Sequence, residues 1–229
     1  MRNSFISTRP PNPTLRRLGH WLVRGAVRIM VKTEYRGQPP GHGREEPLAG
    51  PLLVIYNHTS AIDPPLVLAH LPRPAEALAA SHLWEIRSIR WALNWYRPIP
   101  VYRDVSDLST TSRALRALKA GEMVMVAPEG RISLTGSLEY GRLGVAYLAA
   151  RSEAPVLPVG IVGGERHPQY WRRLRRAPVT LTFGPVFSVP PLARGVRGQA
   201  RKAHLEAAHR QLMQALAATL PAAYRGVWG

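Results

Sequence analysis

The sequence predicts an α/β fold with a central mixed, largely parallel sheet flanked by helices and an N-terminal amphipathic helix. Short apolar runs of strand length alternate with segments of helical periodicity, which is typical of this fold class. The chain has 229 residues, of which 45% are apolar, so it can bury a substantial core. At about 150 residues per domain, this length fits one large domain, or one domain with a helical appendage.

The predicted strands are short and continuously apolar, as expected for strands that are buried on both faces of a sheet. The clearest is LLVIY, and MVMVA is similar. Weaker runs lie between them along the chain. In chain order the predicted strands are residues 52–56, 77–80, 99–102, 123–127, 156–162 and 179–183.

Helical segments separate these strands and follow the last one. Pro64 and Pro65 suit the first positions of a helix, and Gly121 stops another. Pro221 follows the final helical segment closely. In chain order the predicted helices are residues 64–71, 86–95, 108–119, 141–151 and 199–219.

An N-terminal region of residues 1–36 is predicted to precede the α/β domain of residues 37–229. It would consist of a disordered tail over residues 1–12 and a helix capped by Thr14 that runs to about Val31. One side of this helix is apolar and another is basic, which suits a membrane surface. The alternative is a helix packed on the domain with its arginines in water. The apolar side comprises Leu15, Leu18, Leu22, Ala26 and Ile29, and the basic side Arg16, His20, Arg24 and Arg28.

The composition is strongly basic, with 31 lysines and arginines against 14 acidic residues and a net charge of +17. Such a charge attracts nucleic acid, anionic lipid or phosphorylated substrates, although a general enrichment in arginine also explains part of it. The chain has no cysteine, which excludes disulfides, thiolate metal sites and a cysteine nucleophile. No stretch approaches the roughly 20 apolar residues of a membrane span.

The first candidate motif follows the strand 52–56 directly. Asn57 and His58 come at the end of the strand, and Asp63 lies five residues beyond the histidine. On a straight helix this step would turn the two side chains about 140° apart, so they meet only if the segment folds as a loop. Pro64 and Pro65 support such a loop, with Asp63 as the N-cap of the next helix. The alternative is a simple helix cap beside an unrelated loop histidine.

Three further motifs follow other strands. Pro128-Glu129-Gly130-Arg131-Ile132-Ser133 comes after the strand 123–127 and combines a glycine with an arginine that could grip phosphate. It could equally be an ordinary turn. Arg103 follows the strand 99–102, after Tyr102. An apolar, proline-marked segment occupies residues 154–161.

Together these four motifs resemble the glycerolipid acyltransferase family, of the 1-acylglycerol-3-phosphate acyltransferase type. His58 and Asp63 match its His-x4-Asp block, Arg103 its second block, Glu129 and Gly130 its third, and residues 156–159 its fourth. The resemblance covers about residues 50–165. Two positions depart from the pattern, because Arg131 occupies the threonine position of Glu-Gly-Thr-Arg-Ser and Tyr102 precedes the second-block arginine.

The resemblance implies direct transfer of a fatty acyl group from acyl-CoA or an acyl-carrier protein to the hydroxyl of a lysophospholipid, with no acyl-enzyme, bound cofactor or metal. The expected acceptor is 1-acylglycerol 3-phosphate, and glycerol 3-phosphate or another alcohol is the alternative within the family. His58 would be the general base, oriented by Asp63. Asn57 would orient the loop more than react. The expected substrate-binding residues are Asn57, Arg103, Glu129, Gly130, Arg131 and Ser133.

A lipid acceptor implies a peripheral protein at the cytoplasmic face of an anionic membrane. Trp84, Trp91 and Trp95 could wall an acyl groove, although their helical spacing also fits core packing. The alternative from another function class is a nucleic-acid-binding protein, because residues 166–176 combine five arginines with Tyr170 and Trp171. No known nucleic-acid motif supports it. A metal hydrolase is less favoured still, because the eight histidines are scattered.

Overall fold

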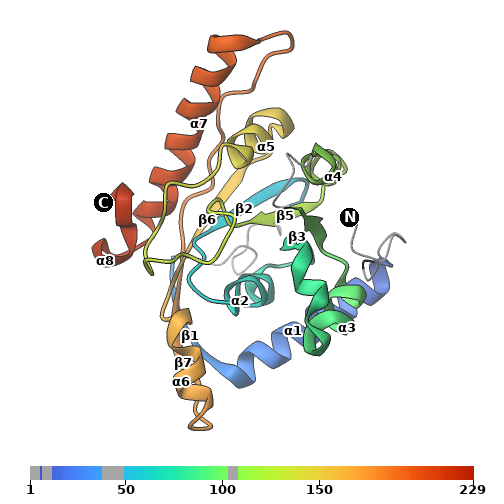
Figure 1. The fold of residues 1–229 in the computed structure, drawn as a ribbon, viewed down its shortest axis with the longest axis vertical. Coiled ribbons are helices and arrows are strands. Elements are labelled where there is room, and N and C mark those ends of the chain that lie inside the picture. Colours follow the sequence, from blue (N-terminus) through green and yellow to red (C-terminus); the bar gives the residue numbers. More distant parts are fainter. Residues whose placement is uncertain (1–5, 7–11, 38–48, 103–107) are drawn as a thin grey trace.

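The computed structural model describes residue 6 and residues 12–37, 49–102 and 108–229. Within these residues seven strands form one sheet in the order β1-β7-β6-β2-β5-β3-β4 (Figure 1). All neighbouring strands are parallel except β6 and β7, which confirms the predicted mixed, largely parallel sheet. The strands are β1 (Val31–Arg36), β2 (Leu52–Tyr56), β3 (Ala75–Ala80), β4 (Ile99–Val101), β5 (Met123–Val126), β6 (Val156–Val162) and β7 (Ala177–Phe183).

Helices cover both faces of this sheet (Figure 1). Side chains of α1 and α2 form one core layer with the sheet, and those of α4, α5 and α7 form the other. None of these helices, as far as the structure describes the chain, is both long and apolar enough to cross a membrane. The α-helices are α1 (Pro13–Met30), α2 (Asp63–His70), α3 (Arg87–Tyr96), α4 (Leu108–Lys119), α5 (Gly144–Ser152), α6 (His167–Trp171), α7 (Gly198–Ala218) and α8 (Ala222–Arg225); short 3-10 helices are η1 (Ser81–Glu85), η2 (Gly164–Arg166) and η3 (Gly226–Trp228).

Strand β2 lies at the centre of the sheet and belongs to both core layers. Leu53 and Ile55 point into the layer of α4, α5 and α7, whereas Leu52, Val54 and Tyr56 point into the layer of α1 and α2. All five side chains are buried. A strand buried on both faces needs apolar residues at every position, which explains the uninterrupted LLVIY sequence.

Strand β1 was not predicted, because VKTEYR shows no apolar run. It pairs in parallel with β7 at the edge of the sheet, in a register that sets Val31 against Ala177. Only Val31 in this strand is fully buried, so its sequence carries almost no strand pattern. Residues 31–36, grouped by the sequence with the N-terminal helix, therefore belong to the sheet. The tail predicted for residues 1–12 lies largely outside the described residues.

Helix α1 packs on the domain through its basic side, which differs from the alternative in which its arginines lie in water. Its buried residues include Arg16, His20 and Val27, and Arg16 forms an ion pair with Glu76 on β3. The apolar side predicted from the sequence faces solvent instead. The predicted cap at Thr14 was wrong, because the N-cap is Asn12. Its Oδ1 accepts hydrogen bonds from the backbone N–H groups of Thr14 and Leu15. The large apolar side chains on its exposed face are Leu15, Leu18, Trp21, Leu22 and Ile29.

The order of strands brings three loops to one edge of the sheet. Strands β6, β2 and β5 are neighbours and run in the same direction, so the segments that follow them emerge side by side. These segments begin at Asn57, Ala127 and Gly163. Loops at the carboxyl ends of parallel strands are the usual place for a site in such folds.

Candidate active site

His58 and Asp63 meet at this edge, as the sequence predicted. The Nδ1 atom of His58 lies 3.1 Å from Oδ2 of Asp63. Asp63 is completely buried, whereas the His58 side chain is 16% exposed. A carboxylate at Nδ1 favours the tautomer that carries its proton there and leaves Nε2 free to accept one. The pair therefore has one end fixed inside the protein and one end able to reach a substrate.

The segment between the two residues folds around the carboxylate. Oδ2 of Asp63 accepts hydrogen bonds from the backbone N–H groups of Thr59, at 2.7 Å, and Ser60, at 2.6 Å. Asp63 is the first residue of α2, and Ile62 is the N-cap, so the predicted N-cap at Asp63 is displaced by one position. Its side chain turns back toward the preceding loop instead of capping the helix ahead. This reversal brings it onto the histidine.

Burial controls the ionisation of this carboxyl. Desolvation raises the pKa of Asp63, while the hydrogen bonds from His58, Ser60 and Thr59 act in the opposite direction. The second oxygen, Oδ1, has no hydrogen-bond partner among the described residues. Gly164 lies directly against it, because a Cβ atom on this glycine would stand 2.5 Å from Oδ1. Gly164 was not predicted as a site residue, because it follows β6 and reaches Asp63 only through the folding of the sheet.

Glu129 connects the loop after β5 to the loop after β2. Its Oε1 accepts a hydrogen bond from the backbone N–H of His58, at 2.9 Å, and its Oε2 accepts one from the N–H of Glu139, at 3.2 Å. Desolvation by burial raises the pKa of Glu129 to about 7. The backbone N–H of Ser133 in turn donates to the carbonyl of His58, at 2.7 Å. Glu129 and Ser133 therefore fix the position of the His58 main chain.

Asn57 joins the loop to the neighbouring strand. Its Nδ2 donates to the carbonyl of Ile161 at 2.9 Å, and its Oδ1 accepts from the N–H of Ile161 at 2.7 Å. The side chain is buried and its donor and acceptor are both used by β6. These two bonds tie the loop after β2 to β6.

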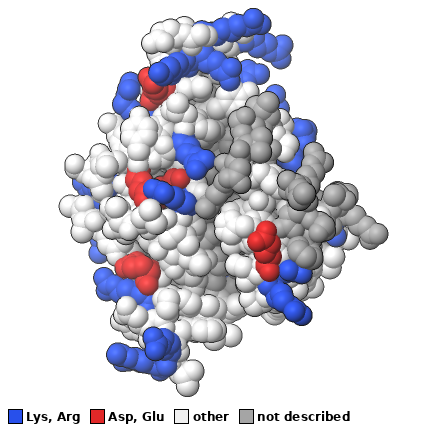
Figure 2. All heavy atoms as spheres, viewed as in Figure 1, with Lys and Arg blue, Asp and Glu red and all other residues white. Residues whose placement is uncertain are grey.

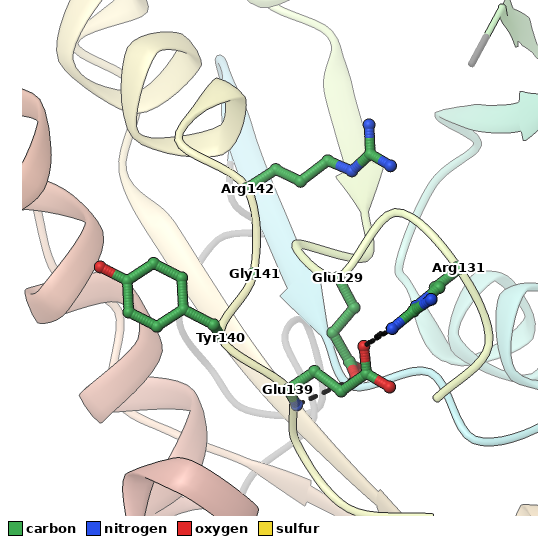
Figure 3. Close-up of a pocket in the computed structure, with 6 residues that line it drawn as sticks. All are labelled: Glu129, Arg131, Glu139, Tyr140, Gly141 and Arg142. Atoms are coloured by element: carbon green, nitrogen blue, oxygen red, sulfur yellow. Dashed lines mark hydrogen bonds and ion pairs between the residues drawn. The ribbon is translucent and has the colours of Figure 1, made fainter. Parts of the chain in front are cut away.

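A pocket of about 260 Å³ is formed by residues of the segment 129–142 (Figure 3), and it includes Glu129, which binds the backbone N–H of His58. Arg131 turns toward Glu139 and binds its Oε2 through Nε and Nη2, at 3.0 and 2.8 Å. Arg142 extends away from Glu139 and lies over Gly130, whose backbone has a φ of +70°. Among the described residues, no carboxylate forms an ion pair with the Arg142 guanidinium. The lining residues are Glu129, Arg131, Glu139, Tyr140, Gly141 and Arg142.

Other predicted residues have different outcomes. The hydroxyl of Ser133 donates to the carbonyl of Ser137, at 2.6 Å. Arg103 lies outside the described residues. Trp84 is buried in the core and Trp91 is exposed, so these two do not share one wall. Among the described residues no three histidine or acidic side chains come together as metal ligands would.

Comparison with known proteins identifies the family. The family model described as Acyltransferase matches residues 24–162, which is more than half of the chain. The chain belongs to the acyltransferase family. The family match spans α1 to β6 and so includes the loops that carry the His58–Asp63 pair and Glu129. The predicted resemblance is confirmed.

Two plant members of the acyltransferase family are similar to this chain. They are chloroplastic 1-acyl-sn-glycerol-3-phosphate acyltransferases, BAT2 of Brassica napus and LPAT1 of Arabidopsis thaliana, each 24% identical. The matches cover 65% and 66% of this chain and 43% of each relative, so they span less than half of the relatives' length. The crystal structure of the 1-acyl-sn-glycerophosphate acyltransferase PlsC from Thermotoga maritima has the same fold, with a TM-score of 0.58 and 21% identity. That match covers 86% of this chain and 78% of PlsC.

Proposed function

We propose that the protein transfers a fatty acyl group from an acyl thioester to the free hydroxyl of a lysophospholipid, with 1-acylglycerol 3-phosphate as the acceptor. The observation that carries this proposal is the contact between Nδ1 of the partly exposed His58 and the buried Asp63. Membership of the acyltransferase family and the activity for which the two plant relatives are named support it. The thioester donor would be acyl-CoA or an acyl-carrier protein.

The proposed reaction has two proton transfers, one during attack of the hydroxyl and one during release of the thiol. The acceptor hydroxyl attacks the thioester carbonyl while Nε2 of His58 takes its proton, forming a carbon–oxygen bond and a tetrahedral intermediate. Collapse of the intermediate breaks the carbon–sulfur bond, and the imidazolium returns the proton to the leaving thiolate. Asp63 holds the ring in place and stabilises its cationic form. The histidine therefore begins and ends the cycle neutral.

The pocket beside the loop supplies positive charge for an acceptor phosphate. Arg131 is already bound to Glu139, whereas Arg142 has no carboxylate partner among the contacts of the described residues. A guanidinium in this state can form charge-assisted hydrogen bonds with a phosphate without first breaking an ion pair. We therefore assign the main phosphate contact to Arg142, with Arg131 as a second contact and Arg103 as a further candidate from the sequence.

The exposed face of α1 is proposed to hold the protein on the membrane that contains the acceptor. Trp21 is 68% exposed and Ile29 is 74% exposed, on the side of the helix opposite to the buried Val27. Arg17 and Arg28, both exposed, lie on the same helix. An apolar helical face flanked by arginines suits the interface of an anionic bilayer. This face would lie on the cytoplasmic leaflet.

The decisive experiment compares purified wild-type protein with the His58→Ala variant, using labelled acyl-CoA. The acceptors are 1-acylglycerol 3-phosphate, glycerol 3-phosphate and monoacylglycerol. We expect transfer to 1-acylglycerol 3-phosphate and a loss of about 10²- to 10⁴-fold in kcat for the variant. His82→Ala, at an exposed histidine, is the matched control and should retain full activity. Equal activity of the wild type and His58→Ala would remove the proposed base.

A further inference from the structure

A basic turn follows α6 and projects from the end of the molecule that carries α1 (Figure 1). Its backbone is closed by hydrogen bonds from the N–H of Leu174 to the carbonyl of Trp171, at 2.9 Å, and from the N–H of Arg175 to the carbonyl of Tyr170, at 3.0 Å. These two bonds have the pattern of a Schellman helix end, in which Leu174 occupies the left-handed position. The turn, residues 171–176, is therefore an ordered structure and is named the α6 tip.

Leu174 is an unfavourable choice for the stability of this turn. Its φ is +51°, a conformation that glycine adopts readily and a leucine adopts rarely. Its side chain is 97% exposed, so it contributes no packing to the core. A large apolar residue that is both strained and fully exposed is explained by a contact outside the folded chain.

The residues around Leu174 indicate the chemistry of that contact. Arg172, Arg173 and Arg175 are exposed, and Trp171 is about half exposed with its ring against that of His167. Figure 2 shows a cluster of basic side chains at the end of the molecule where Figure 1 places the α6 tip. A tryptophan and a leucine surrounded by arginines match the boundary between anionic headgroups and acyl chains.

The α6 tip is fixed to the end of α1. Arg176 donates two hydrogen bonds to the carbonyl of Val31, through Nε at 3.1 Å and Nη2 at 2.7 Å. Val31 directly follows the last residue of α1, and the exposed Ile29 lies two residues earlier. A bilayer that touched this end of α1 would therefore have the α6 tip within its reach.

We propose that the α6 tip is a second membrane-contact element, which inserts Leu174 and Trp171 between lipid headgroups while Arg172, Arg173 and Arg175 bind the lipid phosphates. A nucleic acid could bind the arginines and stack on the tryptophan, but it offers no apolar phase for the leucine. The occupant that satisfies all five side chains is an anionic bilayer. This inference concerns binding alone and does not depend on the acyl-transfer reaction.

The chain has no cysteine, so a single introduced thiol reports on one place only. Leu174→Cys, labelled with an environment-sensitive fluorophore, should shift to the blue on vesicles of equal parts phosphatidylglycerol and phosphatidylcholine, and much less on phosphatidylcholine alone. Arg194→Cys, at an exposed arginine near the start of α7 and far from α6, is the control that should not shift (Figure 1). Sedimentation of the protein with vesicles without a shift at position 174 would overturn the proposal, because α1 would then bind alone.

Unlabelled variants test the same element by affinity. Arg172→Gln/Arg173→Gln should weaken vesicle binding about 10- to 30-fold at low salt, whereas Arg194→Gln/Arg197→Gln, with the same change in charge, should have little effect. Leu174→Asn removes the apolar side chain but suits the left-handed backbone, so it should weaken binding with no loss of thermal stability. Equal weakening by both arginine pairs would contradict the proposal. The proposal would also be contradicted if Arg172→Gln/Arg173→Gln lost DNA binding but bound vesicles as well as the wild type.

Discussion

Oδ1 of Asp63 lies 2.5 Å from the position that a Cβ atom on Gly164 would occupy. The carboxylate comes from the first residue of α2 and the glycine from the segment after β6, so two segments about 100 residues apart meet over the buried oxygen. Real Cβ atoms essentially never approach another heavy atom so closely. A glycine at this position is therefore a condition for the present placement of Asp63.

Gly164→Ala should displace Asp63 and disturb its contact with His58. We expect kcat to fall about 100-fold, because a misplacement of about 1 Å in a catalytic group has effects of this size. The measurement is steady-state acyl transfer together with a thermal melt. Gly144→Ala is the control, since nothing lies within 4 Å of its Cβ position. An unchanged kcat in a folded Gly164→Ala protein would show that the position of Asp63 does not limit the reaction.

The buried Glu129 should make stability fall as pH rises. Desolvation raises its pKa from 4.5 to about 7, so the folded state holds the proton more tightly than the unfolded state. The resulting stabilisation is complete below pH 4.5 and is lost as pH rises through 7. Between pH 4.5 and 7 the free energy of unfolding of the wild type should fall by up to about 3 kcal/mol more than that of the Glu129→Gln variant. Urea unfolding at several pH values measures this difference. Glu85→Gln, at an exposed glutamate, is the control, and its free energy of unfolding should change with pH as that of the wild type does. The same pH dependence in the wild type and Glu129→Gln would contradict the raised pKa of Glu129.

Arg142 and Arg131 should differ in their contribution to acceptor binding. Arg142→Gln should raise KM for 1-acylglycerol 3-phosphate about 10- to 100-fold, the range expected when a hydrogen bond to a charged group is lost. Arg131→Gln should have a smaller effect, because Glu139 already occupies that guanidinium. KM for monoacylglycerol, which has no phosphate, should not change. Arg87→Gln, at the exposed start of α3, is the control. A larger effect at Arg131 would reverse the assignment.

The outer face of α1 should govern binding to vesicles without governing folding. Trp21→Ser and Ile29→Ser should each weaken co-sedimentation with anionic vesicles about tenfold, from the apolar area that no longer enters the bilayer. Both residues point away from the core, so the melting temperature should stay within a few degrees of the wild type. Val186→Ser, at an exposed valine in the segment after β7, is the control. Unchanged sedimentation of the α1 variants would exclude this face as a docking surface.

The strands that carry the site could be predicted because they are buried on both faces. Residues 52–56 and 156–162 match β2 and β6 at both ends. Strand β1 could not be predicted, because an edge strand with one buried residue has no apolar pattern. The helix predicted from residue 141 begins at residue 144 instead. Gly141 has a φ of +82° and packs against His209 and Met213, so the chain before α5 forms a pocket wall.

The candidate site was predictable where one motif contained both partners. His58 and Asp63 are five residues apart, and the prolines after them indicated the turn that joins them. Arg142 and Gly164 could not be found in this way, because each reaches the site through the packing of a distant segment. The orientation of α1 was also beyond the sequence. Both sides of that helix carry apolar residues, and the side that packs inward carries Arg16, whose ion pair with Glu76 joins two distant segments of the chain.

The paired hydrogen bonds of Asn57 with Ile161 extend the ladder between β2 and β6 by one side chain. The histidine next to Asn57 is consequently tied to the central strand pair and not to an independent surface loop. Opening this part of the site requires the middle of the sheet to separate, an event close to global unfolding. The amide of Ile161 should therefore exchange its hydrogen with solvent as slowly as the most protected amides of β2, and the reacting geometry should persist unchanged between one turnover and the next.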